Sequence, residues 1–139
     1  MGKVAIVTGG TRGIGEAICI ALKDAGFTVA ANYAGNAEAA KAFTERTGIP
    51  AYQWDVSDHE ACLAGCAKVA ADLGPIDVVV NNAGITRDGT LLKMSYEAWK
   101  DVIDTNLGGC FNMAKATFSG MKDRGWGRIV NIGSINGQA

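Results

Sequence analysis

Short apolar segments alternate with helical segments along the whole of this 139-residue chain. The apolar runs do not alternate with polar residues, as expected of strands buried on both faces of a parallel sheet. They span residues 3–8, 28–33, 51–54, 76–80 and 128–132. Strands that alternate with helices over short connections form parallel sheets with right-handed crossovers. The sequence therefore predicts an α/β fold with a doubly wound parallel sheet of five strands, in one domain over residues 1–139.

The expected helices have recognisable starting residues. The first helix is expected over about 13–25. Asn36 and Ser95 are placed to cap the second helix and the long fourth helix, because a short polar side chain can accept from the first free amides. Ser57 and Glu60 have the spacing of a capping box, which predicts that the third helix begins there.

The long helix contains an apolar stripe at helical spacing, which we expect to be its buried face. The stripe consists of Trp99, Val102, Ile103, Leu107, Cys110 and Phe111. Asn106 falls inside the stripe, and a buried amide without partners costs about 1–3 kcal/mol, so we expect it to be hydrogen-bonded. Gly108 and Gly109 follow. Glycine costs about 1 kcal/mol in a helix interior, so this pair predicts the close approach of another element or a helix irregularity.

Composition and charge exclude several classes of partner. A net charge of -1 gives no electrostatic reason to expect nucleic acid or a membrane surface. No apolar run approaches the ~20 residues of a membrane-spanning helix. The four cysteines lack metal-ligand spacing and His59 is the only histidine, so we expect no metal site. Without a secretion signal or a disulfide framework, the protein is expected in the cytoplasm.

A glycine-rich turn lies between the first apolar run and the first helix. Its sequence over residues 8–15 is Thr-Gly-Gly-Thr-Arg-Gly-Ile-Gly. Glycine lets the backbone approach phosphate oxygens, and a helix N-terminus offers unpaired amides and the positive end of its dipole. Such a turn can serve tight packing alone. Its position between a strand and a helix favours the alternative, a dinucleotide-binding turn of a Rossmann fold.

The glycine spacing, TGxxxGxG, resembles that of the short-chain dehydrogenase/reductase family. The family's Asn-Asn-Ala-Gly motif matches residues 81–84, and its Asp-Val pair, which contacts the adenine, matches residues 55–56. The motifs occur in the family's order, at the predicted strand ends. The resemblance implies that the following residues bind the cofactor: Gly9, Thr11, Arg12, Gly13, Ile14, Gly15, Asn32, Tyr33, Asp55, Val56, Asn82, Ala83 and Gly84.

Cofactor preference is predicted from the end of the second strand. Folds that bind NAD usually place a carboxylate there to accept from the ribose 2′-hydroxyl. The segment 29–33 contains no carboxylate, and Arg12 in the glycine turn could hold a 2′-phosphate with its planar guanidinium. Arg12 alone could equally be a solvated loop charge. Together the two features predict NADP(H).

Two further matches concern the active site. Asn106 matches the family asparagine that holds a water beside the catalytic lysine, and Ser134 matches the serine that hydrogen-bonds the substrate carbonyl. The family's proton donor is a tyrosine followed four residues later by a lysine. Tyr96 and Lys100 have that spacing but precede Asn106, so we interpret them as helix surface. We therefore expect a chain truncated before the tyrosine and lysine, without the family's later strands, and inactive by itself.

Three segments resemble the family members that reduce acetoacetyl-CoA in polyhydroxyalkanoate synthesis. They are residues 84–88, 121–130 and 134–138. The resemblance implies an NADPH-dependent reduction of this acyl-CoA thioester by a homo-oligomer, in the family a homotetramer. Reductases of 3-oxoacyl carrier proteins share most of the motifs and are the alternative, as is an inactive nucleotide-binding fragment. Asp88 and Lys93 could contact the thioester or could belong to a solvated loop.

Overall fold

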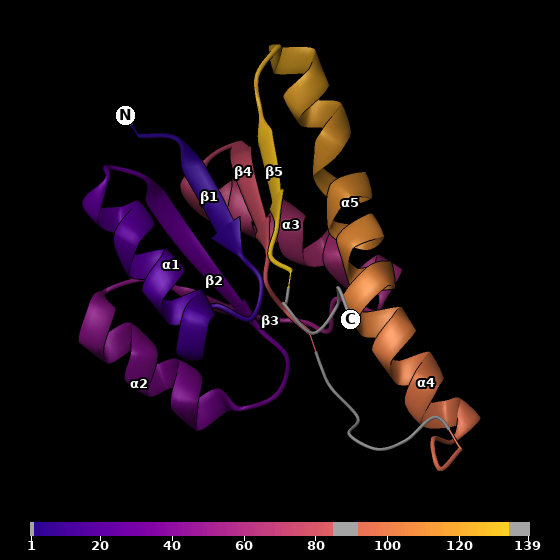
Figure 1. The fold of residues 1–139 in the computed structure, drawn as a ribbon. Coiled ribbons are helices and arrows are strands. Elements are labelled where there is room, and N and C mark those ends of the chain that lie inside the picture. The colour runs from indigo at the N-terminus through magenta and orange to yellow at the C-terminus, as the bar shows by residue number, and fades with distance from the viewer. Residues whose placement is uncertain (1, 85–91, 134–139) are drawn as a thin grey trace.

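The structure, a computed structural model, describes residues 2–84 and 92–133 and confirms the predicted fold. Five parallel strands form one sheet in the order β3-β2-β1-β4-β5, with helices on both faces (Figure 1). Each predicted strand is present, with limits within one residue of those expected. The strands are β1 (Val4–Val7), β2 (Thr28–Tyr33), β3 (Ala51–Gln53), β4 (Ile76–Asn81) and β5 (Arg128–Asn131).

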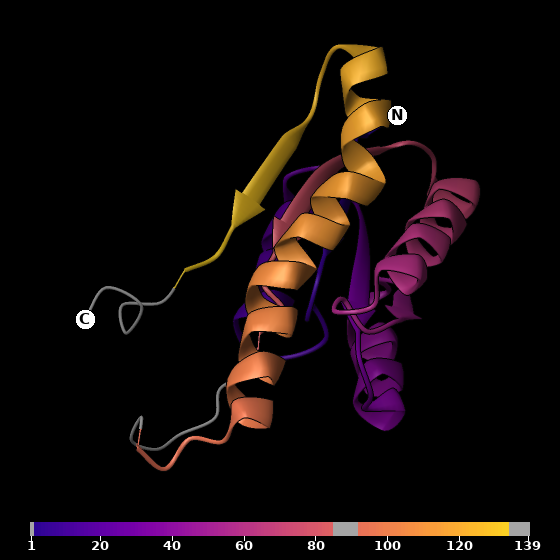
Figure 2. The ribbon, with the colours of Figure 1, turned by 90° about the vertical axis from the view of Figure 1, so that its right-hand side faces the viewer.

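The helices lie in two layers. On one face are α1 (Gly13–Asp24) and α2 (Ala37–Thr47). On the other are α3 (His59–Leu73) and a long helix that begins with α4 (Tyr96–Val102). That helix continues through a π-helical segment, η1 (Ile103–Gly108), into α5 (Gly109–Arg124). Figure 2 shows the long helix running across the face of the sheet beside α3.

Alternate residues of the strands form two cores. Val4, Ile6 and Val79 face α3 and α5, where they pack with Met113. Their neighbours Ala5, Val7 and Val80 face α1 and α2 in the second core, with Phe43 at its centre. Both faces of the central strands are therefore buried, which explains why their sequences lack alternation.

The helix caps confirm two predictions and correct a third. The side chain of Asn36 accepts from Ala39 N at 3.0 Å, and that of Ser95 accepts from Ala98 N at 3.0 Å. The predicted capping box of Ser57 and Glu60 is wrong, because Asp58 caps α3 through Ala61 N. Ser57 instead donates to Asp55 Oδ1 at 2.7 Å. Aspartate at the next position competes for the same free amides, and it shifts the helix start by one residue.

The apolar stripe of the long helix is largely exposed, contrary to the prediction. Leu107 is 67% and Phe111 63% exposed, and Asn106 is exposed with them. The face that packs against the domain contains different residues: Gly109, Asn112, Met113, Thr117 and Met121. Gly109 lets the helix approach Val56 closely, and the two methionines pack in the core with Val69 of α3 and Val79 of β4. An apolar stripe shows only that some face is apolar, and which face packs on the domain depends on the neighbouring elements.

Both consequences expected of the glycine pair are present. Gly108 ends the π-helical segment, which is the helix irregularity. At Gly109 another element approaches closely, since a Cβ built there would lie 2.7 Å from Val56 Cγ2. Among the described residues, no helix is long and apolar enough to cross a membrane.

Candidate functional site

A cavity of about 640 Å³ opens where β1, β2, β3 and β4 end. This is the edge at which open α/β sheets bind ligands. All of the predicted cofactor-binding residues line it except Gly15. The lining also includes Ala39 of α2, Trp54 before the Asp-Val pair, and Thr105 of η1, which the sequence did not identify as site residues, and Asn36, which was predicted only as a helix cap. No sequence signal marks these four residues as part of a binding site, and only the fold brings them to the cavity.

The backbone of the glycine turn has a conformation that would let a ligand approach it closely. Gly9 and Gly13 have positive φ angles of 61° and 57°, which side chains rarely adopt. A Cβ on Gly13 would meet nothing within 4 Å, so the backbone at this point borders open space. A Cβ on Gly15 would lie 2.1 Å from Gly9 O, so Gly15 is required for packing within the turn.

The N-terminus of α1 at this turn has no side-chain cap. Its N-cap residue is Arg12, whose side chain makes no capping hydrogen bond. The helices α2, α3 and α4 are capped by Asn36, Asp58 and Ser95. The first amides of α1 therefore remain available to an anion bound in the cavity.

Arg12 and Asp55 are the only charged residues among the described residues that line the cavity. Arg12 is exposed, and no carboxylate in the described part of the chain pairs with it. Asp55 Oδ1 accepts from both the amide and the hydroxyl of Ser57, which fixes the turn after β3. Within the described residues, the cavity thus has one cation without a carboxylate partner, beside the glycine turn, and one oriented carboxylate at the end of β3.

Asn32 holds the cavity walls together. Its Nδ2 donates to Trp54 O at 3.0 Å, and its Oδ1 accepts from Gly9 N at 3.4 Å. The side chain is buried. The amide therefore joins the end of β2 to the glycine turn on one side and to the end of β3 on the other. Both of its polar atoms are used within the protein.

Thr8 performs a similar task on the other side of the turn, and the sequence did not identify it. Its hydroxyl oxygen accepts from Asn82 N at 3.0 Å and from Ala83 N at 2.9 Å. Asn82 Nδ2 in turn donates to Gly9 O at 3.1 Å. The predicted Asn-Asn-Ala-Gly segment is thereby fixed against the glycine turn. In the sequence, a threonine between an apolar strand and a glycine turn is the signal that could have indicated this role.

The predicted active-site residues are only partly described. Asn106 lies in η1, and a Cβ built on Gly84 would lie 3.1 Å from Asn106 Oδ1, so the asparagine faces the end of β4. Lys93 is exposed before α4 and does not line the cavity. Ser134 and Asp88 lie outside the described residues.

Tyr96 and Lys100 belong to the helix surface, as predicted. Tyr96 is exposed and its ring packs against Trp99. Lys100 forms an ion pair with Asp104 one turn later in the same helix. Neither residue lines the cavity.

Burial makes the three core cysteines poor nucleophiles. It raises the pKa of the Cys19 thiol to about 12, with a smaller contribution from the charge of Glu16. Burial likewise raises the pKa of Cys62 to about 11 and that of Cys66 to about 12. Since the thiolate is the reactive form, these side chains act as small core residues at neutral pH.

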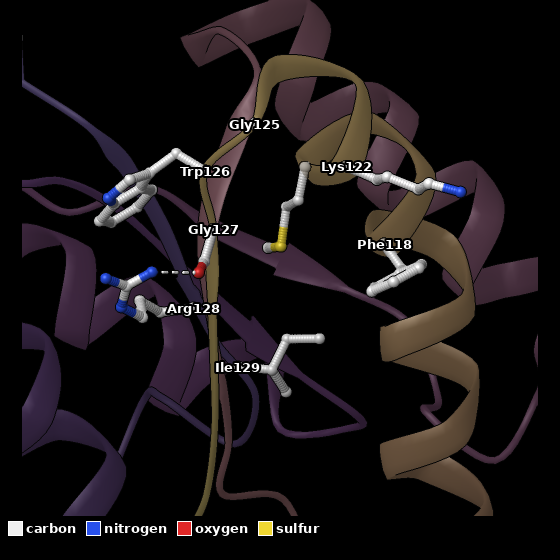
Figure 3. A pocket seen from close by; sticks show the side chains of 8 residues that line it. Phe118, Lys122, Gly125, Trp126, Gly127, Arg128 and Ile129 are labelled. Carbon is white, nitrogen blue, oxygen red and sulfur yellow. Dashed lines mark hydrogen bonds between the residues drawn. The ribbon is translucent and has the colours of Figure 1, made fainter.

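A second cavity, of about 520 Å³, lies between the end of α5 and the start of β5 (Figure 3). This cavity lies at the end of the sheet where the parallel strands begin, because β5 starts there and runs parallel to β1 and β4. The glycine turn lies at the opposite end, where the strands finish. Trp126 points away from α5 and lies between Lys3 and Arg128, which stand 4.0 Å and 4.7 Å from its ring centroid. Residues 124–128 (Arg-Gly-Trp-Gly-Arg), part of one of the segments that resemble the acetoacetyl-CoA-reducing family members, therefore lie around the start of β5 and do not line the first cavity.

Comparison with known proteins identifies similar sequences. The short chain dehydrogenase family model matches residues 3–139. The chain is 65% identical to the acetoacetyl-CoA reductase of Rhizobium meliloti over 138 residues, which are 99% of this chain and 57% of that enzyme. It is 44% identical to the 3-oxoacyl-(acyl-carrier-protein) reductase of Staphylococcus aureus over 143 residues, covering 99% of this chain and 58% of that one.

A solved structure is also similar. It is an actinorhodin polyketide ketoreductase variant crystallised with NADPH, with a TM-score of 0.93 and 36% sequence identity. The match covers 99% of this chain and 55% of that one. The chain therefore spans little more than half the length of the relatives and the structure that it matches.

Proposed function

The chain belongs to the short chain dehydrogenase family, and from that membership we propose that it supplies the NADPH site and part of the active site of a 3-oxoacyl-thioester reductase. The reaction is the reduction of acetoacetyl-CoA to the 3-hydroxyacyl thioester. The observation that supports the cofactor most directly is the cavity at the strand ends, with its glycine turn and with Arg12, which has no carboxylate partner among the described residues.

The residues present fit a phosphorylated dinucleotide. The backbone at Gly13 borders open space, and the uncapped amides of α1 face the same region, so they suit the pyrophosphate. Arg12 suits the 2′-phosphate, because the guanidinium is exposed and has no carboxylate partner among the described residues. Asp55 and Val56 suit the adenine, one as a hydrogen-bond acceptor and the other as an apolar wall.

Residues at the other end of the cavity would orient the substrate. When bound, NADPH supplies the hydride for the carbonyl carbon. Asn106 would act as the family asparagine does, which its position beside Gly84 supports, and Ser134 would donate a hydrogen bond to the carbonyl oxygen. Neither can readily deliver a proton to the developing alkoxide, and the family tyrosine that does so has no counterpart in the 139 residues.

The choice of acetoacetyl-CoA as substrate rests on similarity. The acetoacetyl-CoA reductase of Rhizobium meliloti is 65% identical to this chain, whereas the carrier-protein reductase of Staphylococcus aureus is 44% identical. We accordingly favour the CoA thioester over the acyl carrier protein. We also propose that the reductase works in the cytoplasm as a homotetramer, as members of the family do.

Two measurements test these proposals. In a titration of the 139-residue chain followed by tryptophan fluorescence, NADPH should bind more tightly than NADH, and equal affinities would contradict the cofactor assignment. Oxidation of NADPH by acetoacetyl-CoA should be undetectable with this chain and rapid with a protein extended through the tyrosine and lysine. Preferential turnover of acetoacetyl carrier protein by the longer protein would reverse the substrate assignment.

A further inference from the structure

One buried side chain of α5 reaches the wall of the cofactor cavity from the core. Asn112 is buried, and its Nδ2 donates to Val56 O at 2.8 Å. Val56 lines the cavity, in the irregular segment between β3 and α3. A carbonyl in such a segment has no strand partner to hold it. Val56 O also accepts from Cys62 Sγ at 3.4 Å, but a thiol is a weak donor, so the shorter hydrogen bond from Asn112 is the stronger of the two that hold the wall.

The amide of Asn112 is itself held in one orientation. Since its Nδ2 is directed at a carbonyl, its Oδ1 is the acceptor that faces His59 Nδ1 at 3.2 Å. His59 must therefore carry a proton on Nδ1, and it can do so in both its neutral and its cationic form. The His59 ring also stacks on Phe111, with centroids 6.4 Å apart.

The same stretch of helix touches two walls of the cavity. Gly109, one turn before Asn112, packs against the Val56 side chain so closely that a Cβ would stand 2.7 Å from it. Thr105 lines the cavity, and Asn106 faces Gly84 at the end of β4. Residues 105–112 thus connect the wall after β3 to the wall after β4.

We propose that Asn112 is a positioning residue for the cofactor: it fixes the Asp55–Val56 wall and couples that wall to the helical segment containing Asn106. The inference rests on the proposed function, because it concerns the same cavity. The coupling is physical, since a shift of Val56 must move Gly109 and the amide of Asn112 with it, and these belong to α5, which continues directly from η1.

The test compares variants that remove one contact each. Asn112→Asp keeps the acceptor for His59 but cannot donate to Val56, whereas His59→Phe keeps the Val56 contact and the stacking on Phe111. The control is Met113→Ala, which removes a fully buried side chain that does not line the cavity. The probes are NADPH and adenosine 2′,5′-bisphosphate, and the second occupies only the adenine end.

Asn112→Asp should raise the Kd of both probes about five- to tenfold, and His59→Phe about twofold. Met113→Ala should leave both Kd values unchanged, even where it lowers the melting temperature as much as Asn112→Asp does. Equal weakening by Met113→Ala, or an unchanged Kd in Asn112→Asp, would overturn the inference while leaving the proposed function intact. Failure of the unchanged chain to bind either probe would overturn the proposed function, and this inference with it.

Hydrogen exchange on the unchanged chain provides a second measurement that does not depend on a folded Asn112 variant. NADPH should slow amide exchange at residues 54–58 and also at 105–112. Protection confined to the glycine turn and residues 54–58 would show that the helix is not coupled to the cavity. If Asn112 had a purely structural role, protection would be confined in this way to the glycine turn and residues 54–58.

Discussion

Arg12 is the residue whose charge has no partner in the described part of the cavity, and cofactor preference should depend on it. We expect Arg12→Ala to weaken NADPH binding by about 1.5–3 kcal/mol, because a charge-assisted contact to the 2′-phosphate is lost. NADH, which lacks that phosphate, should be affected little. The measurement is a binding titration of both cofactors with the variant.

The matched control for this change is Arg46→Ala. Arg46 is also exposed and pairs with Glu16 at 2.9 Å on the α1–α2 surface, but it does not line the cavity. Its removal should leave both affinities unchanged. Equal losses of NADPH and NADH binding in Arg12→Ala would show that the arginine supports the turn and does not contact the 2′-phosphate.

Asn32 lies at the strand end where a carboxylate would select NADH, but its side chain is already used. Asn32→Asp replaces the Nδ2 donor by a carboxylate oxygen facing Trp54 O. We expect a loss of about 1–3 kcal/mol in the free energy of unfolding, since the carbonyl loses its donor in a buried place. Urea unfolding measures this, and Asn32→Ser is a milder control without the added charge. Full stability of the aspartate variant, with a preference for NADH, would show that this side chain turns towards the cofactor.

The sequence predicted which residues surround the cavity, because parallel strands must bring their carboxyl ends to one edge. The sequence did not predict the direction in which these side chains point. Asn32 near the end of β2 and Thr8 directly after β1 turn inward and form hydrogen bonds within the protein, whereas Arg12 at the start of α1 has no carboxylate partner among the described residues. Their difference depends on which polar backbone groups the neighbouring strands leave unpaired, and that is a property of the tertiary structure.

The junction of η1 and α5 offers a matched pair of substitutions at the scale of one helix. A Cβ on Gly108 would meet only Ile103 O, at 3.8 Å, whereas on Gly109 it would lie 2.7 Å from Val56 Cγ2. We expect Gly108→Ala to stabilise the fold by up to about 1 kcal/mol, through helix propensity. Gly109→Ala should destabilise it by about 1–3 kcal/mol, through overpacking. Urea unfolding of the two variants gives both values, and equal effects would show that the helix can move away from Val56.

The positions of helices and strands along the chain could be predicted from the sequence, but the contacts between them could not. Strand limits and the caps Asn36 and Ser95 follow from local sequence, so they were predicted correctly. The buried face of the long helix was not, because Leu107 and Phe111 are as apolar as core residues although they lie on the surface. Which face packs inward is decided by the fit of Gly109 and Asn112 to Val56, and hydrophobic periodicity contains no information about such a fit.

The buried thiols make the stability of the whole molecule fall at alkaline pH. Burial raises the pKa of Cys19 and Cys66 from 9.0 to about 12 and that of Cys62 to about 11. Below pH 9 these thiols are protonated in both the folded and the unfolded state. As the pH rises above 9, only the unfolded state ionises, so each thiol should lower the free energy of unfolding by about 1 kcal/mol between pH 9 and pH 10. Urea unfolding at several pH values should show a shallower decline in Cys66→Ala, and an unchanged slope would contradict the assignment.

The last prediction concerns the edge of the sheet at β5. This strand pairs with β4 on one side and, within the described residues, with no strand on the other. Val130 and Ile132 there are 45% and 40% exposed. An open, apolar edge presents unpaired amides and carbonyls to other chains, so we expect the 139-residue chain to self-associate.

Sedimentation at increasing concentration measures this association, and the double change of Val130 and Ile132 to Lys should shift the chain towards the monomer, because edge charges oppose strand pairing. Phe118→Lys is the contrasting variant, since it adds a charge to an exposed side chain of α5 that lines the cavity beside the start of β5, and it leaves the side chains of the strand unchanged. If Phe118→Lys disperses the chain and the edge variant does not, then the surface of the long helix is what associates. A monomer at all concentrations before any substitution would show that neither surface does, and that the edge of β5 is stable in water.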